Sequence, residues 1–318
     1  MKKLVSIVCC LLMTVSLVGC GEKEGTVKVG VVQLAEHPAL NAATEGFNDE
    51  LKRLMPEVEI IEKNANGEIS ACSTIVDGFI TKKVDLIMAN ATPALQAASA
   101  KTESIPILGT SVTEYGVALG IEDFNGVTGF NVSGTTDLAP LEQQAQMILD
   151  LIPNVKTVGI LYCSNEDNSK YQVKIVSEYL QSKNIKVETK SFTDSTDIKS
   201  TTEKLCGMVD AIYVPTDNKA ADNGEAINDV CFERKIPVIS GEEGTCKTCG
   251  LATLTIDYYE LGKVTANMAY RILTGQEKVE EMKIENYPNP VKKFNKTNAE
   301  NLGITIPSDY IEVELEEE

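Results

Sequence analysis

Short runs of β-branched and other apolar residues alternate along this chain with longer amphipathic stretches. Up to residue 108 the pattern predicts strands at 27–34, 58–61, 84–88 and 105–108, and helices at 38–54, 69–82 and 92–101. After Asn131 it predicts helices at 138–151, 168–183, 198–208 and 221–235, and strands at 157–162, 185–192, 211–214 and 237–240. Because this alternation is typical of parallel sheets covered by helices, the sequence indicates an α/β protein.

The two series resemble each other in their order of elements. Val84–Met88 opens one block, which ends at Ile105–Gly109, and Val209–Tyr213 opens another, which ends at Ile236–Gly241. The repetition predicts two Rossmann-like lobes with parallel sheets, joined by a hinge. Ligands of open α/β sheets bind at the carboxyl ends of the strands, so two facing lobes would enclose one ligand in a cleft.

Extended, glycine-containing segments are candidates for the connections between the lobes. Such segments lie at 126–131 and 250–255, and a third crossing is expected near 275–290. We therefore expect a first lobe made of residues 27–131 and 257–275, and a second lobe made of residues 132–256 and 276–318.

The N-terminus has the features of a secretory signal. Lys2 and Lys3 precede an apolar run, 4–18, which is shorter than the roughly 20 residues of a membrane-spanning helix. The sequence 17–20, Leu-Val-Gly-Cys, resembles the lipobox of bacterial lipoproteins, although a Cys present by chance is the alternative. We expect a signal peptide at 1–19, a lipid on Cys20 and a polar tether at 20–26. The protein would then be anchored on the extracytoplasmic face of the cell membrane.

The acidic composition excludes one class of partner. Net charge is −18, and it becomes −20 without Lys2 and Lys3. A nucleic-acid-binding protein needs basic side chains to neutralise phosphates, so we expect no nucleic acid as a partner. An acidic chain does not adhere to anionic lipid unaided, so membrane attachment would depend on the anchor at Cys20. We expect a monomer.

Six of the nine cysteines lie in the body of the chain, and two of them are close in sequence. Cys246 and Cys249 form a Cys-x-x-Cys pair in a glycine-bounded loop, without a second pair. A local disulfide or two free thiols, a redox pair and a metal site are the alternatives for this motif. The chain has one His and lacks a P-loop, a nucleophile elbow and a dinucleotide-binding glycine turn. We expect neither enzymatic activity nor a cofactor or metal.

Polar residues follow several of the predicted strands, where the cleft would lie. Gln33 and His37 precede a helix that begins at Pro38, and the free N–H groups of a helix start can receive an anion. Capping, turns or a surface loop would explain any one of these polar residues, including Thr92 as an N-cap. Their joint placement favours recognition. The expected ligand-binding residues are Gln33, His37, Thr92, Glu166, Asn168, Ser169, Asp217, Asn218, Glu242 and Asp257.

The body of the chain resembles the substrate-binding lipoproteins of ABC transporters with the type I periplasmic-binding-protein fold, a family with tryptophan- and tyrosine-binding members. The matching stretches are Val32–Leu40, Ala91–Ala94, Tyr162–Ser169, Pro215–Asn218, Gly241–Gly244, Ile256–Gly262 and Leu302–Pro307. The resemblance implies a receptor that closes on a small solute, often an aromatic amino acid, and delivers it to an ABC permease. Two departures lie near the expected cleft: Glu114–Tyr115 and the Cys pair after Glu243.

An amino acid ligand needs groups that receive its carboxylate and its ammonium, and a pocket for its side chain. The helix starts at Pro38 and Thr92 are candidates for the first. Candidates for the second are Asp217, Glu166 and Glu242. Candidates for stacking against an aromatic ligand are Tyr115, Phe130, Tyr162 and Tyr213, and the lack of Trp disfavours sugars.

Two other functions remain open from the sequence. One is a sensory receptor on the same scaffold, binding a nucleoside or a sugar. The other is an extracytoplasmic thiol or metal enzyme that uses Cys246 and Cys249.

Overall fold

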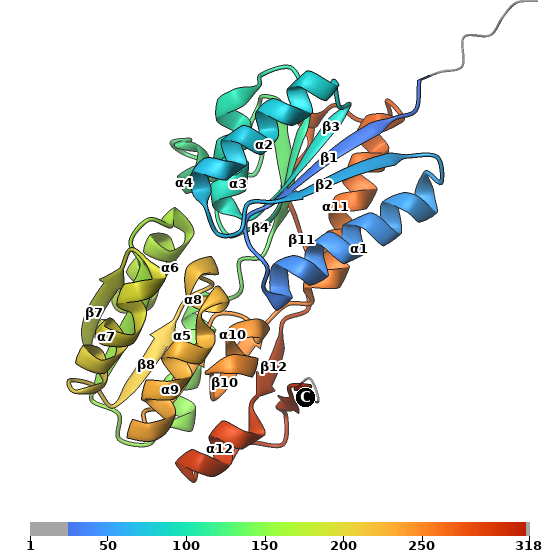
Figure 1. The fold of residues 1–318 in the computed structure, drawn as a ribbon. Coiled ribbons are helices and arrows are strands. Elements are labelled where there is room, and N and C mark those ends of the chain that lie inside the picture. The colour runs from blue at the N-terminus through green and yellow to red at the C-terminus, as the bar shows by residue number, and fades with distance from the viewer. Residues whose placement is uncertain (1–24, 316–318) are drawn as a thin grey trace, which may run out of the picture.

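The first lobe contains a six-stranded parallel sheet in the computed structural model, which describes residues 25–315 (Figure 1). The strand order is β11-β5-β4-β3-β1-β2. The strands are β1 (Lys28–Gln33), β2 (Glu59–Asn64), β3 (Leu86–Asn90), β4 (Ile107–Val112), β5 (Val132–Thr136) and β11 (Glu285–Asn286). The helices are α1 (Pro38–Leu54), α2 (Ile69–Lys82), α3 (Thr92–Lys101), α4 (Tyr115–Leu119), α11 (Tyr258–Leu273) and the 3₁₀ turn η1 (Val279–Glu281).

The second lobe contains a seven-stranded sheet, in the order β13-β12-β10-β9-β8-β6-β7. The strands are β6 (Thr157–Cys163), β7 (Lys186–Phe192), β8 (Ala211–Val214), β9 (Val238–Ser240), β10 (Ala252–Thr255), β12 (Val291–Phe294) and β13 (Ile311–Glu312). β12 is antiparallel to β10, and the other pairs are parallel. The helices are α5 (Leu141–Leu151), α6 (Asp167–Ser182), α7 (Ser195–Cys206), α8 (Asn218–Asp222), α9 (Gly224–Arg234), α10 (Glu243–Thr248) and α12 (Lys296–Leu302).

Helices cover both faces of the first sheet, as the alternating pattern predicts. α2 and α3 pack on one face, and α1 and α11 pack on the other (Figure 1). Phe79 of α2 and Leu95 of α3 belong to one buried apolar cluster. Phe47 of α1 and Met268 of α11 belong to the other. The α/β class and the two-lobe architecture expected from the sequence are confirmed.

Backbones of α1 and α11 approach each other closely because two glycines face the contact. A Cβ atom on Gly46 would lie 2.0 Å from the carbonyl oxygen of Tyr259, and one on Gly262 would lie 2.1 Å from that of Ala43. Such distances are too short for any side chain. This contact holds α1 against α11. The first turn of α1 directly follows His37, which lies at the cleft.

The described chain crosses between the lobes at 256–257, where a boundary was expected, but sheet pairing moves the two boundaries expected at 131 and 275. Residues 126–131 were expected to cross between lobes, but β5, which follows them, pairs with β4 in the first sheet. Gly126 and Gly129, with φ of +95° and +79°, form turns within the first lobe instead. β10 likewise pairs with β9, so 250–255 lies within the second lobe, and β11 pairs with β5, so 285–286 lies in the first.

The described chain therefore crosses between the lobes after β5, after β10 and after β11. These crossings comprise 137–140, 256–257 and 287–290. The glycine-containing runs that resemble linkers in the sequence are partly strands, because a backbone buried between two neighbouring strands pairs with them whatever its glycine content.

Other local expectations also differ from the structure. The helix expected at 221–235 is two helices, α8 and α9, which meet at Asn223. Cys246 lies in the short helix α10 and Cys249 is its C-cap, although this segment was expected to be a loop. The expected signal peptide, Cys20 and most of the tether lie outside the described residues. None of the helices within 25–315 has the length and apolar character needed to cross a bilayer.

Candidate functional site

A cavity lies between the lobes, at the carboxyl ends of strands from both sheets. The first lobe and its crossings contribute His37, Ala39, Leu40, Ser111, Thr113, Asp137 and Tyr258. The second lobe contributes Asn168, Thr216, Asp217, Asn218, Ala221 and Glu242. This placement agrees with the cleft that the doubly wound pattern predicts.

Four buried polar atoms of the cavity lining have no hydrogen-bond partner in the protein. They are Nδ1 of His37, Oγ of Ser111, Oδ1 of Asp137 and Oδ1 of Asn168. An unsatisfied buried polar atom costs about 1–3 kcal/mol, and nearly all such atoms are paired in native proteins. Four of them around one cavity indicate a place for a polar ligand.

Asp137 is the carboxylate of this cavity with an available oxygen. It lies on the first crossing, is buried, and its Oδ2 accepts a hydrogen bond of 3.0 Å from the hydroxyl of Tyr258. Its Oδ1 remains unpaired. Burial raises the pKa of Asp137 to about 6, against the hydrogen bond from Tyr258, and Glu242 adds to the rise.

The first lobe presents its strand ends to the cleft through unusual backbone conformations. Ser111, near the end of β4, has a φ of +53°, and Ala91, which directly follows β3, has a φ of +95°. Residues other than glycine rarely adopt positive φ, and such conformations gather at binding sites, where the surrounding structure holds them. The unpaired Ser111 hydroxyl therefore sits on a segment held in a costly conformation.

Asp217 of the second lobe is engaged within its own lobe. Its Oδ1 accepts a hydrogen bond from the backbone N–H of Ala220 and caps α8. Its Oδ2 accepts from the backbone N–H of Cys163 at 2.6 Å and from the hydroxyl of Ser169 at 2.7 Å. Burial and the nearby carboxylate of Glu166 raise the pKa of Asp217 to about 7.

Glu166 orients two amide side chains of the cavity. Its carboxylate accepts hydrogen bonds from the backbone N–H groups of Asn218 and Lys219. It also accepts from the side-chain amides of Asn218 at 2.6 Å and Asn168 at 3.1 Å. The amide of Asn168 donates a second bond to the carbonyl of Thr216, which leaves its Oδ1 free at the cavity.

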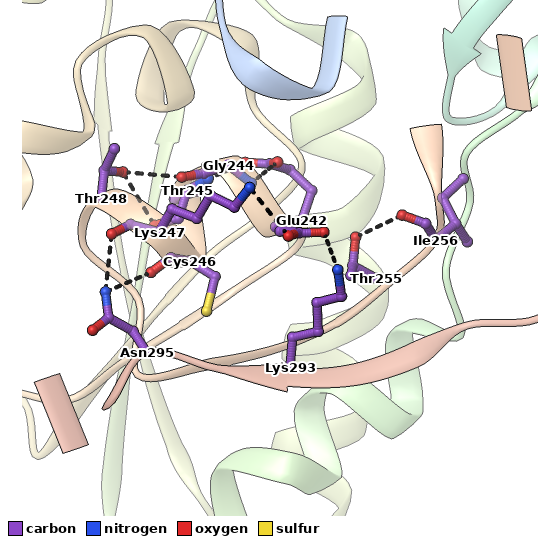
Figure 2. Close-up of polar contacts among 11 residues, drawn as sticks. Glu242, Gly244, Thr245, Cys246, Lys247, Thr248, Thr255, Ile256, Lys293 and Asn295 are labelled. Atoms are coloured by element: carbon purple, nitrogen blue, oxygen red, sulfur yellow. Dashed lines mark hydrogen bonds and ion pairs between the residues drawn. The ribbon is translucent and has the colours of Figure 1, made fainter. Parts of the chain in front are cut away.

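Glu242 is the N-cap of α10, and its carboxylate is occupied by hydrogen bonds within this segment. Both oxygens accept hydrogen bonds at the start of α10, from the backbone N–H groups of Gly244 and Thr245 and from the hydroxyl of Thr245 (Figure 2). Beyond them, Lys293 and Lys247 pair with Glu243. The carboxylates of Glu242, Asp217 and Glu166 therefore stabilise the backbone segments around the cleft, because their oxygens accept hydrogen bonds from backbone N–H groups.

The expected ligand residues separate into three groups in the structure. Those that line the cavity are His37, Asn168, Asp217, Asn218 and Glu242. Glu166 lines a wider cavity nearby. Outside the cavity lining are Gln33, Thr92, Ser169 and Asp257. Gln33 is bonded to Ala35, Asn41 and Thr44, and Asp257 is an exposed cap of α11.

Two local expectations for this region are wrong. Thr92 is the first residue of α3, and the N-cap is Ala91. Tyr115, which departs from the family pattern and was expected near the cleft, lies in the core of the first lobe, where its hydroxyl donates to the carbonyl of Thr135. Of the expected stacking residues, Tyr213 is likewise a core residue, and Phe130 and Tyr162 do not line the cavity.

Five lining residues with polar side-chain groups are absent from the expected ligand residues, namely Ser111, Thr113, Asp137, Thr216 and Tyr258. Asp137 had a usable signal, since it follows a strand directly, as Asp217 nearly does. Asp137 was not recognised because the lobe boundary was expected at residue 131, which assigned the β5 segment to the second lobe instead of the first.

The lobes contact each other beside the cavity. Nε2 of His37 lies 3.4 Å from Oδ1 of Asn218, and the amide of Gln96 donates to Asp167 at 3.0 Å. Asn218 also lines a wider cavity, to which both lobes contribute residues.

Cys246 and Cys249 show no arrangement typical of a redox or metal site in the described structure. Cys246 and Cys249 are both buried and free, and burial raises the pKa of Cys249 to about 12. Within residues 25–315, no three His, Cys, Asp or Glu side chains are arranged to hold a metal ion.

The chain is similar to known proteins over nearly its whole length. The model of the family described as ABC transporter substrate binding protein matches residues 28–316. A tyrosine-binding protein of Clostridioides difficile (strain R20291) is 32% identical over 294 residues, covering 86% of this chain and 85% of that protein.

Two solved structures are informative about the arrangement of the lobes. One is an ABC domain from Streptococcus pneumoniae in complex with L-Trp, with TM-score 0.85, 32% identity, and coverage of 89% of this chain and 96% of that one. The other is a ligand-free, open substrate-binding protein with adhesive properties from Clostridium difficile, with TM-score 0.70, 34% identity, and coverage of 92% and 100%.

Because identity and coverage are similar in the two comparisons, the higher score indicates that the lobes here are arranged more as in the L-Trp complex. The contacts between the lobes agree with this arrangement. The family is one of solute-binding proteins rather than enzymes. By its match over residues 28–316 and its relatives, this chain belongs to the ABC transporter substrate-binding proteins.

Proposed function

We propose that this protein captures a zwitterionic aromatic amino acid, tyrosine, tryptophan or phenylalanine, and delivers it to the permease of an ABC importer. The observation that carries the proposal is the inter-lobe cavity with four unpaired buried polar atoms drawn from both lobes. A ligand that satisfies atoms of both lobes binds the closed form better than the open form, and this difference in affinity drives closure.

The ligand's ammonium group would bind Asp137. The free Oδ1 of this residue is the unpaired carboxylate oxygen of the lining, and a charge-assisted hydrogen bond is about twice as strong as a neutral one. Oδ1 of Asn168 would be a second acceptor. These assignments replace Asp217, Glu166 and Glu242 as ammonium receivers, because those carboxylates are engaged by backbone N–H groups.

The carboxylate and the side chain of the ligand would lie in the remaining lining. The hydroxyl of Ser111 is unpaired and can donate to a carboxylate. Nδ1 of His37 is also unpaired, and it is an acceptor because Nε2 donates to Oδ1 of Asn218. Leu40, Ala221 and Tyr258 supply apolar surface. A neutral sugar or nucleoside would leave the Asp137 carboxylate buried without a counter-charge, which disfavours the alternative ligands.

Calorimetric titration of the exported, purified protein with these amino acids tests the proposal. We expect binding that Asp137→Asn weakens by about 30-fold, since a hydrogen bond to a charged group contributes about 2 kcal/mol. Asp257→Asn is the matched control, because it removes an exposed carboxylate outside the cavity, and it should bind normally. Binding of a sugar or nucleoside in place of amino acids would overturn the ligand.

We also propose that the protein works on the extracytoplasmic face of the membrane, held there by a lipid on Cys20. The support is the sequence 17–20 and the basic, then apolar, segment before it. Cys20→Ala should release the protein from washed membranes into the medium or periplasm, without changing its ligand affinity. Continued membrane association of that variant would contradict the anchor.

A further inference from the structure

Two cysteine side chains of the second lobe lie in direct contact. Cys206 ends α7 and Cys231 lies in α9, and their Sγ atoms are 3.8 Å apart. Both side chains are buried, with 7% and 2% of their surface exposed. Disulfide sulfurs are about 2.05 Å apart, so a rotation of one side chain or a small helix shift would bring these two within bonding distance.

The surroundings of the pair favour a cross-link over a metal or catalytic role. Apolar residues of α7 and α9, such as Leu205 and Val230, enclose both thiols in the same core cluster. The hydrogen bond between the two thiols lowers the pKa of Cys206, whereas the same hydrogen bond and burial raise the pKa of Cys231. Since the thiolate is the reactive form, Cys206 is the better attacking group.

We propose that Cys206 and Cys231 form a disulfide in the exported protein. The proposal rests on the extracytoplasmic location proposed above, because disulfides persist in oxidising compartments. The oxidant is the disulfide of an extracytoplasmic thiol oxidoreductase, which reaches the pair while the chain folds. No thiol outside the pair is required.

The reaction is a pair of thiol–disulfide exchanges. The Cys206 thiolate attacks one sulfur of the oxidant's disulfide, which forms a mixed disulfide and releases one thiolate of the oxidant. The Cys231 thiolate then attacks the Cys206 sulfur and releases the oxidant's second thiolate. The two cysteines lose two protons and two electrons, and the oxidant leaves as a dithiol after taking up both protons.

The cross-link would close a loop that carries part of the ligand cavity. Residues 206–231 include β8, the cavity residues Thr216–Asn218 and α8. A disulfide restricts the unfolded chain, so it stabilises the folded lobe. It would also join the two helices that flank the segment holding Asp217 and Asn218.

Two other pairings compete with this one and define the test. Cys231 and Cys249 line the same small cavity under α9, and Cys246 precedes Cys249 by three residues. Trypsin separates all of these cysteines, because Lys219, Arg234 and Lys247 lie between them. Each pairing therefore gives a linked peptide of its own mass.

The experiment is peptide mapping of the exported protein, denatured in N-ethylmaleimide without reductant and digested with trypsin. We expect the peptide 205–219 linked to 220–234, and maleimide on Cys72, Cys163, Cys246 and Cys249. Maleimide on both Cys206 and Cys231 would overturn the proposal, and so would a link from Cys231 to Cys249 or between Cys246 and Cys249.

Thermal unfolding gives a second, independent measurement. Reductant should lower the Tm of the wild-type protein by roughly 5 °C. It should leave the Tm of the Cys206→Ser/Cys231→Ser variant unchanged, whereas Cys72→Ser should keep the reductant effect. Neither measurement involves a ligand, so failure of the disulfide and failure of the amino acid assignment are distinguishable. A wild-type Tm that does not respond to reductant would contradict the proposal.

Discussion

At the scale of single residues, the cleft contains several acidic side chains with different tasks. Asp217 and Glu242 accept hydrogen bonds at helix starts, and Glu166 holds the amides of Asn218 and Asn168 in place. Asp137 differs because one of its oxygens is buried and free. Position at a strand end is shared by all of them, so only the distribution of hydrogen bonds identifies the receiver of a ligand charge.

Ligand affinity should therefore depend on the ionisation of Asp137. Burial raises its pKa to about 6, so below pH 6 the free protein must lose a proton before it can pair with an ammonium group. We expect the Kd for the amino acid to increase by up to tenfold per pH unit as the pH falls from 6 to 5. Asp137→Asn should show a flat profile across this range. A wild-type profile as flat as that of the variant would exclude Asp137 as the receiver.

Asp137 should affect the stability of the unliganded protein in the opposite direction. Its pKa is raised from 3.8 in the unfolded chain to about 6 in the fold, so the folded state binds more protons between these values. Its contribution is present below pH 4 and is lost as the pH rises through 6, which amounts to about 3 kcal/mol. The free energy of unfolding of Asp137→Asn, relative to the wild type, should therefore increase from pH 4 to pH 7. Chemical denaturation at both pH values measures it, and a constant difference would contradict the raised pKa.

At the scale of helices and strands, amphipathic periodicity predicted some elements to the residue. The expected bounds 38–54, 69–82 and 92–101 are those of α1, α2 and α3. Periodicity cannot locate helices as short as α4 and α10, which span less than two turns. It also cannot assign a strand to a lobe, because pairing of β5 with β4 and of β10 with β9 depends on contacts distant in sequence.

The same limit applies to the cavity. Asp137 and Tyr258 are 121 positions apart, yet they share a hydrogen bond. The sequence around either residue does not indicate that the other is its partner. His37 and Asn218, which were expected at the cleft, follow strands whose ends could be located from the sequence. Asp137 lies on the first crossing and depended on a lobe boundary that the sequence analysis expected at 131, whereas Tyr258 is the first residue of α11, directly after the second crossing.

Contact between α1 and α11 should be intolerant of side chains at its glycines. In Gly46→Ala the new Cβ would meet the Tyr259 carbonyl oxygen at 2.0 Å, so the helices must separate. We expect a loss of about 3 kcal/mol in unfolding free energy, at the upper end of overpacking effects. Gly78→Ala in α2 is the control, because its Cβ would meet no atom within 4 Å, and it should be neutral or stabilising by up to ~1 kcal/mol. Equal stability of the two variants in urea would refute the close packing.

At the scale of the whole molecule, closure depends on a small number of polar contacts between lobes as well as on the ligand. The amide of Gln96 donates both to the carbonyl of Ala118 in its own lobe and to Asp167 in the other. Such a contact exists only when the lobes are together, so it stabilises the closed form and not the open one. Any change in its strength alters the apparent ligand affinity through the population of the closed form.

Gln96→Ala should therefore weaken ligand binding although Gln96 does not line the cavity. Loss of a hydrogen bond of about 1 kcal/mol in the closed form corresponds to a Kd about five times higher. Lys101→Ala is the matched control, because it removes an exposed ion pair with Asp77 inside the first lobe and should leave the Kd unchanged. Small-angle X-ray scattering at saturating ligand should give both variants the same compact radius of gyration, since the ligand still closes the lobes. If Gln96→Ala bound with wild-type affinity, the Gln96–Asp167 contact would have no part in closure, and the ligand and the His37–Asn218 pair would account for it.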